Sequence, residues 1–385
     1  MKLLRFYNHV VRWKNNLYDI RVKKSIFILF VAKIIYTLYG VFVFSKISSI
    51  SDADSYLNAP IIISQNLLVS NTVLMGTITA LLKRILFIDF FVHLAYSLFS
   101  FYCLKLLIES LKLSRKLEYF LVFMLILPSF GTWTSVIVKE SLSCSLSSIG
   151  LIWIVNLINN EKIRFPMLIN IICIYFTLVL RPIIGFSLIS LISTIYVYRV
   201  PFLNKYAKAF FIIGFITIFS GAAVFLGLNY IKDEFIPLAE YYFDPRFSTS
   251  KSARPLGFWK TAADFYLKAP EGIFIANLGP NLIESINNPF FIPYFFEGLI
   301  FIGVTFYLLI TNILYEIRRA IFNPVFLFTI FFGIIVVLLF NYPFGLYNPG
   351  SAIRYRCSYY HVIIVLLLLF YSNEKKIAVR NLTKL

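Results

Sequence analysis

Residues 165–199 read FPMLINIICIYFTLVLRPIIGFSLISLISTIYVYR. Apolar side chains fill both halves of this stretch, and each half has about the 17 to 25 residues that a membrane-spanning helix needs. Proline lacks a backbone N–H and fits the first turn of a helix, so Arg181-Pro182 predicts that one helix ends and the next begins there. We therefore expect helices at 165–181 and 183–199, joined by a tight outer turn that presents Arg181. A snorkelling arginine is the simpler alternative.

The rest of the chain has the same apolar character. Hydrophobic residues make up 59% of the 385 residues and charged residues only 14%, whereas soluble domains carry about 25% charged residues. The mean hydropathy is +0.81. This composition predicts an all-α polytopic membrane protein. The apolar runs that predict its ten transmembrane helices are 25–45, 86–108, 118–137, 140–158, 165–181, 183–199, 209–229, 290–314, 324–343 and 358–372.

The distribution of basic residues predicts the orientation of these helices. The formal net charge is +18, but lysines and arginines fall mainly in the gaps between apolar runs. That distribution is typical of the positive-inside rule, so we expect no nucleic-acid partner. The rule places residues 1–24 and 373–385 in the cytoplasm, seven helices in 25–229, an extracytoplasmic loop at 230–289 and three helices in 290–372. No small-residue cleavage site follows the first apolar run, so we expect no cleavable signal peptide.

Two segments depart from the pattern of simple spans. Residues 61–82 are long enough to cross but carry several polar side chains, and a crossing there would turn most basic loops outward. We expect this segment to be an amphipathic or re-entrant piece on the outer surface. The loop at 230–289 mixes charges, prolines and aromatics, which predicts short helices over the membrane domain. Aromatic side chains of this loop could stack on sugars: Tyr241, Tyr242, Phe243, Phe258, Trp259, Phe265 and Tyr266.

An acidic string, SDADSY at 51–56, follows the first span. Two carboxylates at positions i and i+2 can hold a divalent metal, act as a general base or simply solvate a loop. Charged groups at membrane depth cost several kcal/mol and tend to mark working sites. We therefore take Asp52 and Asp54 as candidate catalytic carboxylates.

Lys139-Glu140 stands at the start of another predicted span, after the polar tip LPSFGTWTS at 127–135. The pair can be an interfacial ion pair that stabilises a helical hairpin. Alternatively, the free N–H groups and positive dipole end of the helix favour an anion there. In that case Lys139 binds phosphate, and Glu140 is either its orienting partner or a catalytic base.

A second polar string, NPGSAIRYR at 348–356, precedes the last span and carries Arg354 and Arg356. Guanidinium groups bind phosphate oxygens bidentately and stay charged in any environment. His361 is more commonly an interior histidine with satisfied hydrogen bonds than a catalyst. The residues that we take as candidate substrate-binding residues are Lys139, Arg181, Arg246, Arg254, Arg354, Arg356 and His361.

Several familiar catalytic motifs are absent from the sequence. It contains no phosphate-binding P-loop, no Gly-rich dinucleotide turn, no His-Glu-x-x-His zinc motif and no Cys-x-x-Cys pair. The four cysteines are scattered and lack the spacing of metal ligands. We expect a protein with neither cofactor nor metal.

Together these features resemble the bacterial O-antigen polymerases, the Wzy-type polysaccharide repeat-unit polymerases. The resemblance covers the architecture, the acidic string, the Arg-Pro turn and the string at 348–356. It also includes the Pro-Ser, Trp-x-Ser and Lys-Glu elements between Pro128 and Glu140. It implies glycosyl transfer at the outer face of a bacterial inner membrane. The growing glycan on undecaprenyl pyrophosphate would move onto the next lipid-linked repeat of an O-antigen, capsule or exopolysaccharide. It also implies a flippase and a chain-length regulator as partners.

The residues are compatible with this reaction. A pyrophosphate leaving group needs positive charge, for which we expect a clamp of Arg181, Arg354 and Arg356. The acceptor hydroxyl needs a base, for which Asp52, Asp54 and Glu140 are the candidates. Two other functions fit the same pattern. One is a GT-C-type glycosyltransferase that uses a polyprenyl-phosphate sugar, and the other is a flippase or other transporter of lipid-linked oligosaccharides.

Overall fold

A computed structural model of the chain describes residues 23–47, 52–63, 66–199, 207, 210, 214, 233–234, 236–243, 253–318 and 323–382. Within these ranges every regular element is helical, which confirms the all-α prediction for this part of the chain. The first eleven elements are α2 (Lys24–Tyr39), η2 (Gly40–Phe44), α3 (Ser45–Ile47), α4 (Ala53–Leu57), α5 (Asn66–Val69), α6 (Asn71–Leu86), α7 (Asp89–Leu111), α8 (Arg115–Leu125), α9 (Pro128–Trp133), α10 (Lys139–Ile158) and α11 (Met167–Leu180). The others are α12 (Pro182–Arg199), α14 (Ile236–Phe243), α15 (Ala262–Leu267), α16 (Ala269–Leu278), α17 (Leu282–Asn287), η4 (Pro289–Phe291), α18 (Ile292–Arg318), α19 (Pro324–Val336), η5 (Val337–Asn341), α20 (Tyr342–Tyr347) and α21 (Pro349–Leu382).

Seven helical stretches in the described ranges are long and apolar enough to cross a membrane, and each coincides with a predicted run. They are Lys24–Ile47, Asp89–Leu111, Lys139–Ile158, Pro182–Arg199, Pro289–Arg318, Val325–Tyr347 and Pro349–Asn373. Two other predicted runs form shorter helices. The run at 165–181 gives α11, with 14 residues, and the run at 118–137 is divided between α8 and α9 because Pro128 starts a new helix. The run at 209–229 lies outside the described residues, apart from 210 and 214.

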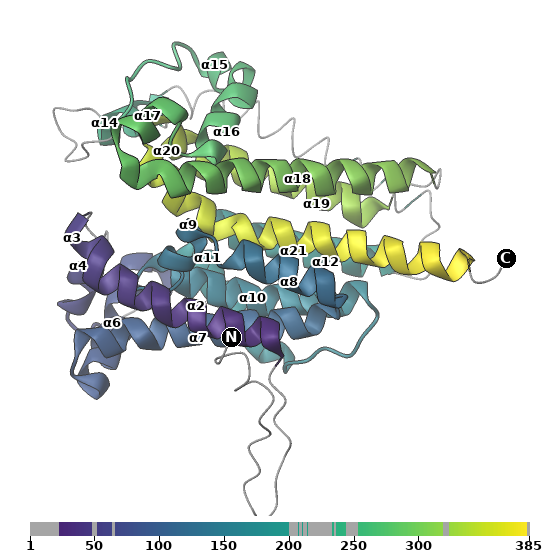
Figure 1. Ribbon diagram of the computed structural model, residues 1–385, viewed down its shortest axis with the longest axis horizontal. Coiled ribbons are helices and arrows are strands. Elements are labelled where there is room, and N and C mark those ends of the chain that lie inside the picture. The colour runs from purple at the N-terminus through teal and green to yellow at the C-terminus, as the bar shows by residue number, and fades with distance from the viewer. Residues whose placement is uncertain are drawn as a thin grey trace, which may run out of the picture.

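The long helices lie side by side, and the short helices collect at one end of them (Figure 1). We call this end the short-helix end; it carries α4, α9, α14 to α17 and α20. At the opposite end, ion pairs connect the loops that follow α7 and α10. Lys112 lies 2.8 Å from Glu161, and Arg164 lies 3.1 Å from Glu109. We call this second end the basic-loop end.

Helix α10 is the centre of the bundle. It packs against α7, α11, α12 and α21, and its residues are almost all buried. Its sequence is rich in serine and also holds Gly150. Small residues let neighbouring helices approach closely in a membrane protein, where lipid is as apolar as the helices themselves. The position of α10 brings its first turn, with Lys139 and Glu140, to the short-helix end.

Arg181 forms the turn between α11 and α12, as the sequence predicts. Its N–H donates to the carbonyl of Thr177 at 2.8 Å, and its carbonyl accepts from the N–H groups of Ile184 and Gly185 at 3.0 and 3.1 Å. Gly185 makes the tight turn sterically feasible, because a Cβ there would lie 2.4 Å from the Cα of Leu178. The side chain of Arg181 is thereby fixed at the short-helix end.

The segment between α2 and α7 begins and ends at the short-helix end. Lys139 of α10 donates to Asn71 at the start of α6 at 3.0 Å, and Lys83 near the end of α6 lies 3.0 Å from Asp89 at the start of α7. The segment therefore does not carry the chain to the basic-loop end.

The described part of residues 230–289 contains the short helices α14 to α17, and two of its aromatic side chains lie in the interior. Trp259 and Phe265 are buried and pack against Tyr342 and Tyr347 of α20. Trp259 donates its indole N–H to the hydroxyl of Tyr342 at 2.6 Å. These two side chains form a small apolar core, and we correct the expectation that they stack on sugars.

Replacing Gly185 with alanine tests the close contact of α11 with α12. The new Cβ meets backbone atoms that cannot swing away, and overpacking of this kind costs about 1–3 kcal/mol. We expect Gly185→Ala to lower the thermal unfolding midpoint of the detergent-solubilised protein. Gly303→Ala in α18 is the matched control, since a Cβ there meets no heavy atom within 4 Å. Equal midpoints for the two variants would contradict the tight turn.

Candidate functional site

Glu140 is the centre of a cluster of charged residues at the short-helix end. Its side chain is completely buried. Its Oε1 atom accepts a hydrogen bond from Arg181 Nη2 and another from Arg354 Nε at 2.8 Å. One carboxylate oxygen thus joins the first turn of α10, the α11–α12 turn and the early part of α21.

Asp52 extends the cluster toward the exterior. Its Oδ2 atom lies 3.6 Å from Arg354 Nη2 and accepts a hydrogen bond from the hydroxyl of Tyr56 at 3.2 Å. Burial, together with the charge of Asp52, raises the pKa of Tyr56 far above its ordinary value. The phenol therefore stays protonated and remains a donor to Asp52. The acidic string and the arginine of the second polar string thus meet directly.

Lys139 adds a third cation beside the two arginines. Its Nζ donates to Asn71 Oδ1 at 3.0 Å and to Thr72 Oγ1 at 3.3 Å. It also lies 6.0 Å from the ring centre of Tyr56. These neutral acceptors position the ammonium group without cancelling its charge. Among the described residues, two carboxylates and three cations meet here, which leaves one formal positive charge in excess.

Aromatic rings support the two guanidinium groups. Arg181 lies over the rings of Phe340 and Tyr355, at 5.1 and 5.3 Å from their centres. Arg354 lies 5.6 Å from the ring centre of Trp133. Contacts of this kind contribute about 0.5–2 kcal/mol each and restrain the orientation of the guanidinium plane.

Three helices begin at this cluster. They are α10 at Lys139, α12 at Pro182 and α21 at Pro349. The N-terminus of a helix carries about half a positive charge, which favours an anion. The peptide dipoles therefore have the same sign as the excess charge of the side chains.

Two buried polar atoms of the cluster have no hydrogen-bond partner among the residues that the structure describes. They are Glu140 Oε2 and Arg181 Nε. A buried polar atom without a partner costs about 1–3 kcal/mol. Such atoms are informative in a charged cluster, because a bound ligand or a proton in transit could satisfy them.

Arg356 does not belong to this cluster. It is fully buried, donates from Nη1 to the carbonyl of Asn277 at 2.6 Å, and lies 3.7 Å from Glu297 Oε1. Glu297 in turn accepts from the backbone N–H of Ser129 at 2.6 Å. These bonds join α21 to α16, α18 and α9. We therefore correct the expected clamp, which retains Arg181 and Arg354 but loses Arg356.

Arg254 also has a packing role. Its Nε and Nη2 atoms bind both carboxylate oxygens of Glu284 at 2.6 and 2.7 Å. Its Nη1 atom donates to the carbonyls of Gly345 and Leu346, each at 3.0 Å. The guanidinium group thus attaches the loop to α20, and the structure does not bring it to the cluster.

The remaining predicted residues lie elsewhere. His361 is completely buried in α21, where its Nε2 atom lies 2.8 Å from Ser147 Oγ. Asp54 is exposed and forms no ion pair with another residue in the described ranges. Arg246 lies outside those ranges. Of the predicted site residues, the structure therefore brings together Asp52, Lys139, Glu140, Arg181 and Arg354.

Some members of the cluster were not singled out from the sequence. Asn71 lies within the 61–82 segment, where it is one of several polar residues. Phe340 and Tyr355 are aromatic residues in a chain with 42 phenylalanines and 25 tyrosines, so their type carries little information. The signals for rings close to the site were Tyr355, which follows Arg354, and Trp133, one of only 4 tryptophans, in the Trp-x-Ser element.

The Arg356–Glu297 pair gives a test of the packing role. Arg356→Met leaves Glu297 as an uncompensated buried charge, and breaking a buried pair in this way costs about 3–5 kcal/mol. We expect a marked fall in the unfolding midpoint. The double variant Arg356→Met/Glu297→Met removes both charges and should recover much of the loss. An Arg356→Met protein as stable as the wild type would contradict this role.

Comparison with known proteins does not assign the site. No protein-family model, curated protein or solved structure matches this chain. The interpretation of the cluster therefore depends on its own geometry and charge.

Proposed function

We propose that this protein is a polysaccharide polymerase that joins oligosaccharide repeats carried on undecaprenyl pyrophosphate. The observation that supports the proposal most strongly is that Arg181 and Arg354 are held side by side by Glu140 at one end of a helical bundle. Two adjacent guanidinium groups offer the positive charge and the paired N–H donors that a pyrophosphate favours. Lys139 and the helix N-termini add positive potential from the same direction.

The reaction needs stabilisation of a leaving anion more than it needs a strong acid. The acceptor hydroxyl oxygen attacks the anomeric carbon of the growing glycan. The bond from that carbon to the pyrophosphate oxygen breaks, and its electron pair stays on the lipid pyrophosphate. Arg181 and Arg354 bind the charge that develops there, while the hydroxyl proton passes to a carboxylate.

We assign the role of base to Asp52 rather than to Glu140. Glu140 is completely buried and already holds two guanidinium groups, so it serves to position them. Asp52 has a side chain that is 48% exposed and is therefore accessible to an incoming hydroxyl group. Tyr56 orients Asp52 through their hydrogen bond.

Orientation in the membrane follows from the positive-inside rule. Lys112, Arg115, Lys162 and Arg164 occupy the loops at the basic-loop end, which the rule places in the cytoplasm. The cluster then faces the outer side of a bacterial inner membrane, with both termini in the cytoplasm. The proposed topology keeps ten spans, including 209–229, and the extracytoplasmic loop at 230–289.

The product that the protein forms distinguishes the proposed polymerase from the two alternative functions, a GT-C-type glycosyltransferase and a flippase. A polymerase converts lipid-linked repeats into a ladder of long chains, whereas a GT-C-type enzyme adds a single sugar and a flippase changes no bond. A strain that lacks the protein should accumulate unpolymerised repeats on the outer leaflet. The partners expected beside it are a flippase and a chain-length regulator.

Alanine replacement of the two clamp arginines tests the site. Removing one donor to a developing anion costs about 10²- to 10³-fold in rate. We therefore expect Arg181→Ala and Arg354→Ala each to abolish long glycan chains on a gel while the protein remains in the membrane. Arg199→Ala is the matched control, since Arg199 ends α12 at the basic-loop end, where its side chain donates to Asn160 Oδ1 at 2.6 Å. Normal ladders from both clamp variants would refute the proposed site.

Asp52 and Asp54 provide a matched pair for testing the base. Loss of a general base slows a reaction by about 10²- to 10⁴-fold, so we expect Asp52→Asn to lower the polymerisation rate by that factor. Asp54→Asn should polymerise at nearly the wild-type rate, because Asp54 does not reach the cluster. The measurement is the initial rate of chain growth by purified protein on lipid-linked repeats. If the two variants lost activity equally, Asp52 would have no special role.

A further inference from the structure

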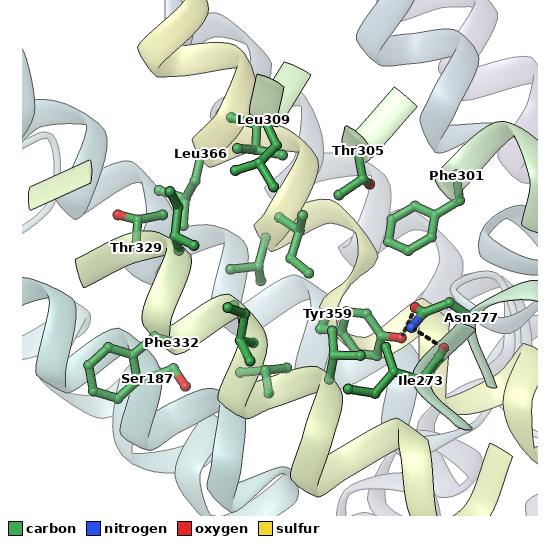
Figure 2. A pocket seen from close by; sticks show the side chains of 18 of the residues that line it. Ser187, Ile273, Asn277, Phe301, Thr305, Leu309, Thr329, Phe332, Tyr359 and Leu366 are labelled. Carbon is green, nitrogen blue, oxygen red and sulfur yellow. Dashed lines mark hydrogen bonds between the residues drawn. The ribbon is translucent and has the colours of Figure 1, made fainter. Parts of the chain in front are cut away.

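A cavity of about 460 Å³ lies among α12, α16, α18, α19 and α21 (Figure 2). Its size is within the range of about 300–1,000 Å³ that is typical of ligand pockets. Apolar side chains form most of its wall, among them Leu309, Phe332 and Leu366. Three other wall residues, Phe274, Phe306 and Ile334, are 50%, 56% and 56% exposed. The cavity therefore opens sideways, where lipid surrounds a membrane-embedded bundle.

Most polar groups at this wall have hydrogen-bond partners: Ser187 and Thr329 donate to carbonyls of their own helices, while Thr305 Oγ1 has no partner among the described residues. Figure 2 shows the hydroxyl of Tyr359 bound to Asn277 Oδ1 at 2.8 Å, and the amide of Asn277 bound to the carbonyl of Ile273 at 2.8 Å. Cavities lined by apolar groups stay dry and accept apolar molecules. A hydrocarbon chain is thus the chemical class that fits this space.

Helices α12 and α21 connect the cavity wall with the charged cluster. On α12, Ile184 at the wall stands one turn after Arg181, and on α21, Tyr359 at the wall stands one turn after Tyr355. Residues at this spacing lie on the same face of a helix.

The α19–η5 helix makes the same connection. Val336 and Val337 at the wall stand about one turn before Phe340, whose ring lies under Arg181. Each of the three helices therefore connects a residue in or directly beside the cluster with a wall residue about one turn away.

We propose that this cavity holds the first part of the hydrocarbon chain of the lipid whose anionic head binds Arg181 and Arg354. The inference depends on the proposed function, and it adds the site of the tail to that of the head. A cationic cluster adjoining an apolar cavity complements an amphiphile, in which a charged head and an apolar chain are joined. Occupation of both places fixes the head at a defined depth, and this improves the alignment of the reacting bond.

Gly333 of α19 allows the cavity to be filled without disturbing the fold. It lies at the wall, and a Cβ there would meet no heavy atom within 4 Å. Gly303 of α18 is an equally open glycine, but it borders a different cavity of about 220 Å³ near α8. Gly333→Phe and Gly303→Phe therefore make the same change in two places, and only the first reduces the proposed lipid site.

The experiment uses a polyprenyl pyrophosphate with a photoreactive diazirine on an early isoprene unit, added to the full-length protein in lipid nanodiscs. We expect the label on cavity residues such as Thr305 and Thr329. Gly333→Phe should reduce this labelling by about tenfold or more, whereas Gly303→Phe should leave it unchanged. Excess inorganic pyrophosphate should reduce it in the wild type.

Two results would overturn the inference. One is labelling outside the cavity or undiminished by Gly333→Phe, as expected if another apolar segment of the chain fills the space. The other is equal labelling of the cavity by the uncharged polyprenol, which would show a general lipid site. Binding of inorganic pyrophosphate to the Gly333→Phe protein separates the two proposals. If that binding persists while tail labelling fails, the head site survives and only the tail site is lost.

Discussion

The ionised carboxylate of Glu140, buried between Arg181 and Arg354, is the constraint on which the arrangement of the bundle depends. An isolated charge cannot be buried among apolar helices without a cost of several kcal/mol, so α10 requires cationic partners at its first turn. Those partners come from the α11–α12 turn and from α21. The pairing therefore fixes the relative height of three helices, and the rings of Phe340, Tyr355 and Trp133 fill the space around it.

Helix α21 also takes part in a second buried ion pair, between Arg356 and Glu297. The position of this pair explains why Arg354 and Arg356 have different roles. Successive residues of an α-helix are turned by about 100°, so Arg354 and Arg356 face nearly opposite directions on α21. Arg354 reaches Glu140 and Asp52 near the open side of the cluster. Arg356 reaches Glu297 and the end of α16 in the interior. One arginine thereby reaches the open side of the cluster, and the other holds α21 against its neighbours.

The sequence predicted most of the long helices, because a long apolar run is a strong local signal. It also selected Asp52, Glu140 and two arginines, Arg181 and Arg354, as candidates for one site, because charges at membrane depth are unusual. It did not predict that Arg356 would be buried against Glu297 and away from the cluster. The last helix was expected to begin near 358, which left the string at 348–356 as a turn, whereas α21 begins at Pro349. Helical phase then decides which arginine enters the cluster. The burial of Trp259 was equally inaccessible, since it depends on contact with Tyr342, which is 83 residues away.

The exposure of the cluster residues distinguishes a buried side from an open side, and the proposed reaction uses both. Side-chain exposure rises from 0% at Glu140 through 10% at Arg181 and 18% at Arg354 to 48% at Asp52. In the proposed reaction, a lipid pyrophosphate that enters beside the cavity meets Arg181 first, since Arg181 adjoins Ile184 at its wall. The acceptor hydroxyl of that proposal approaches from the exposed side, where Asp52 lies. The proposed donor and acceptor thus reach the cluster from its buried and its exposed side, respectively.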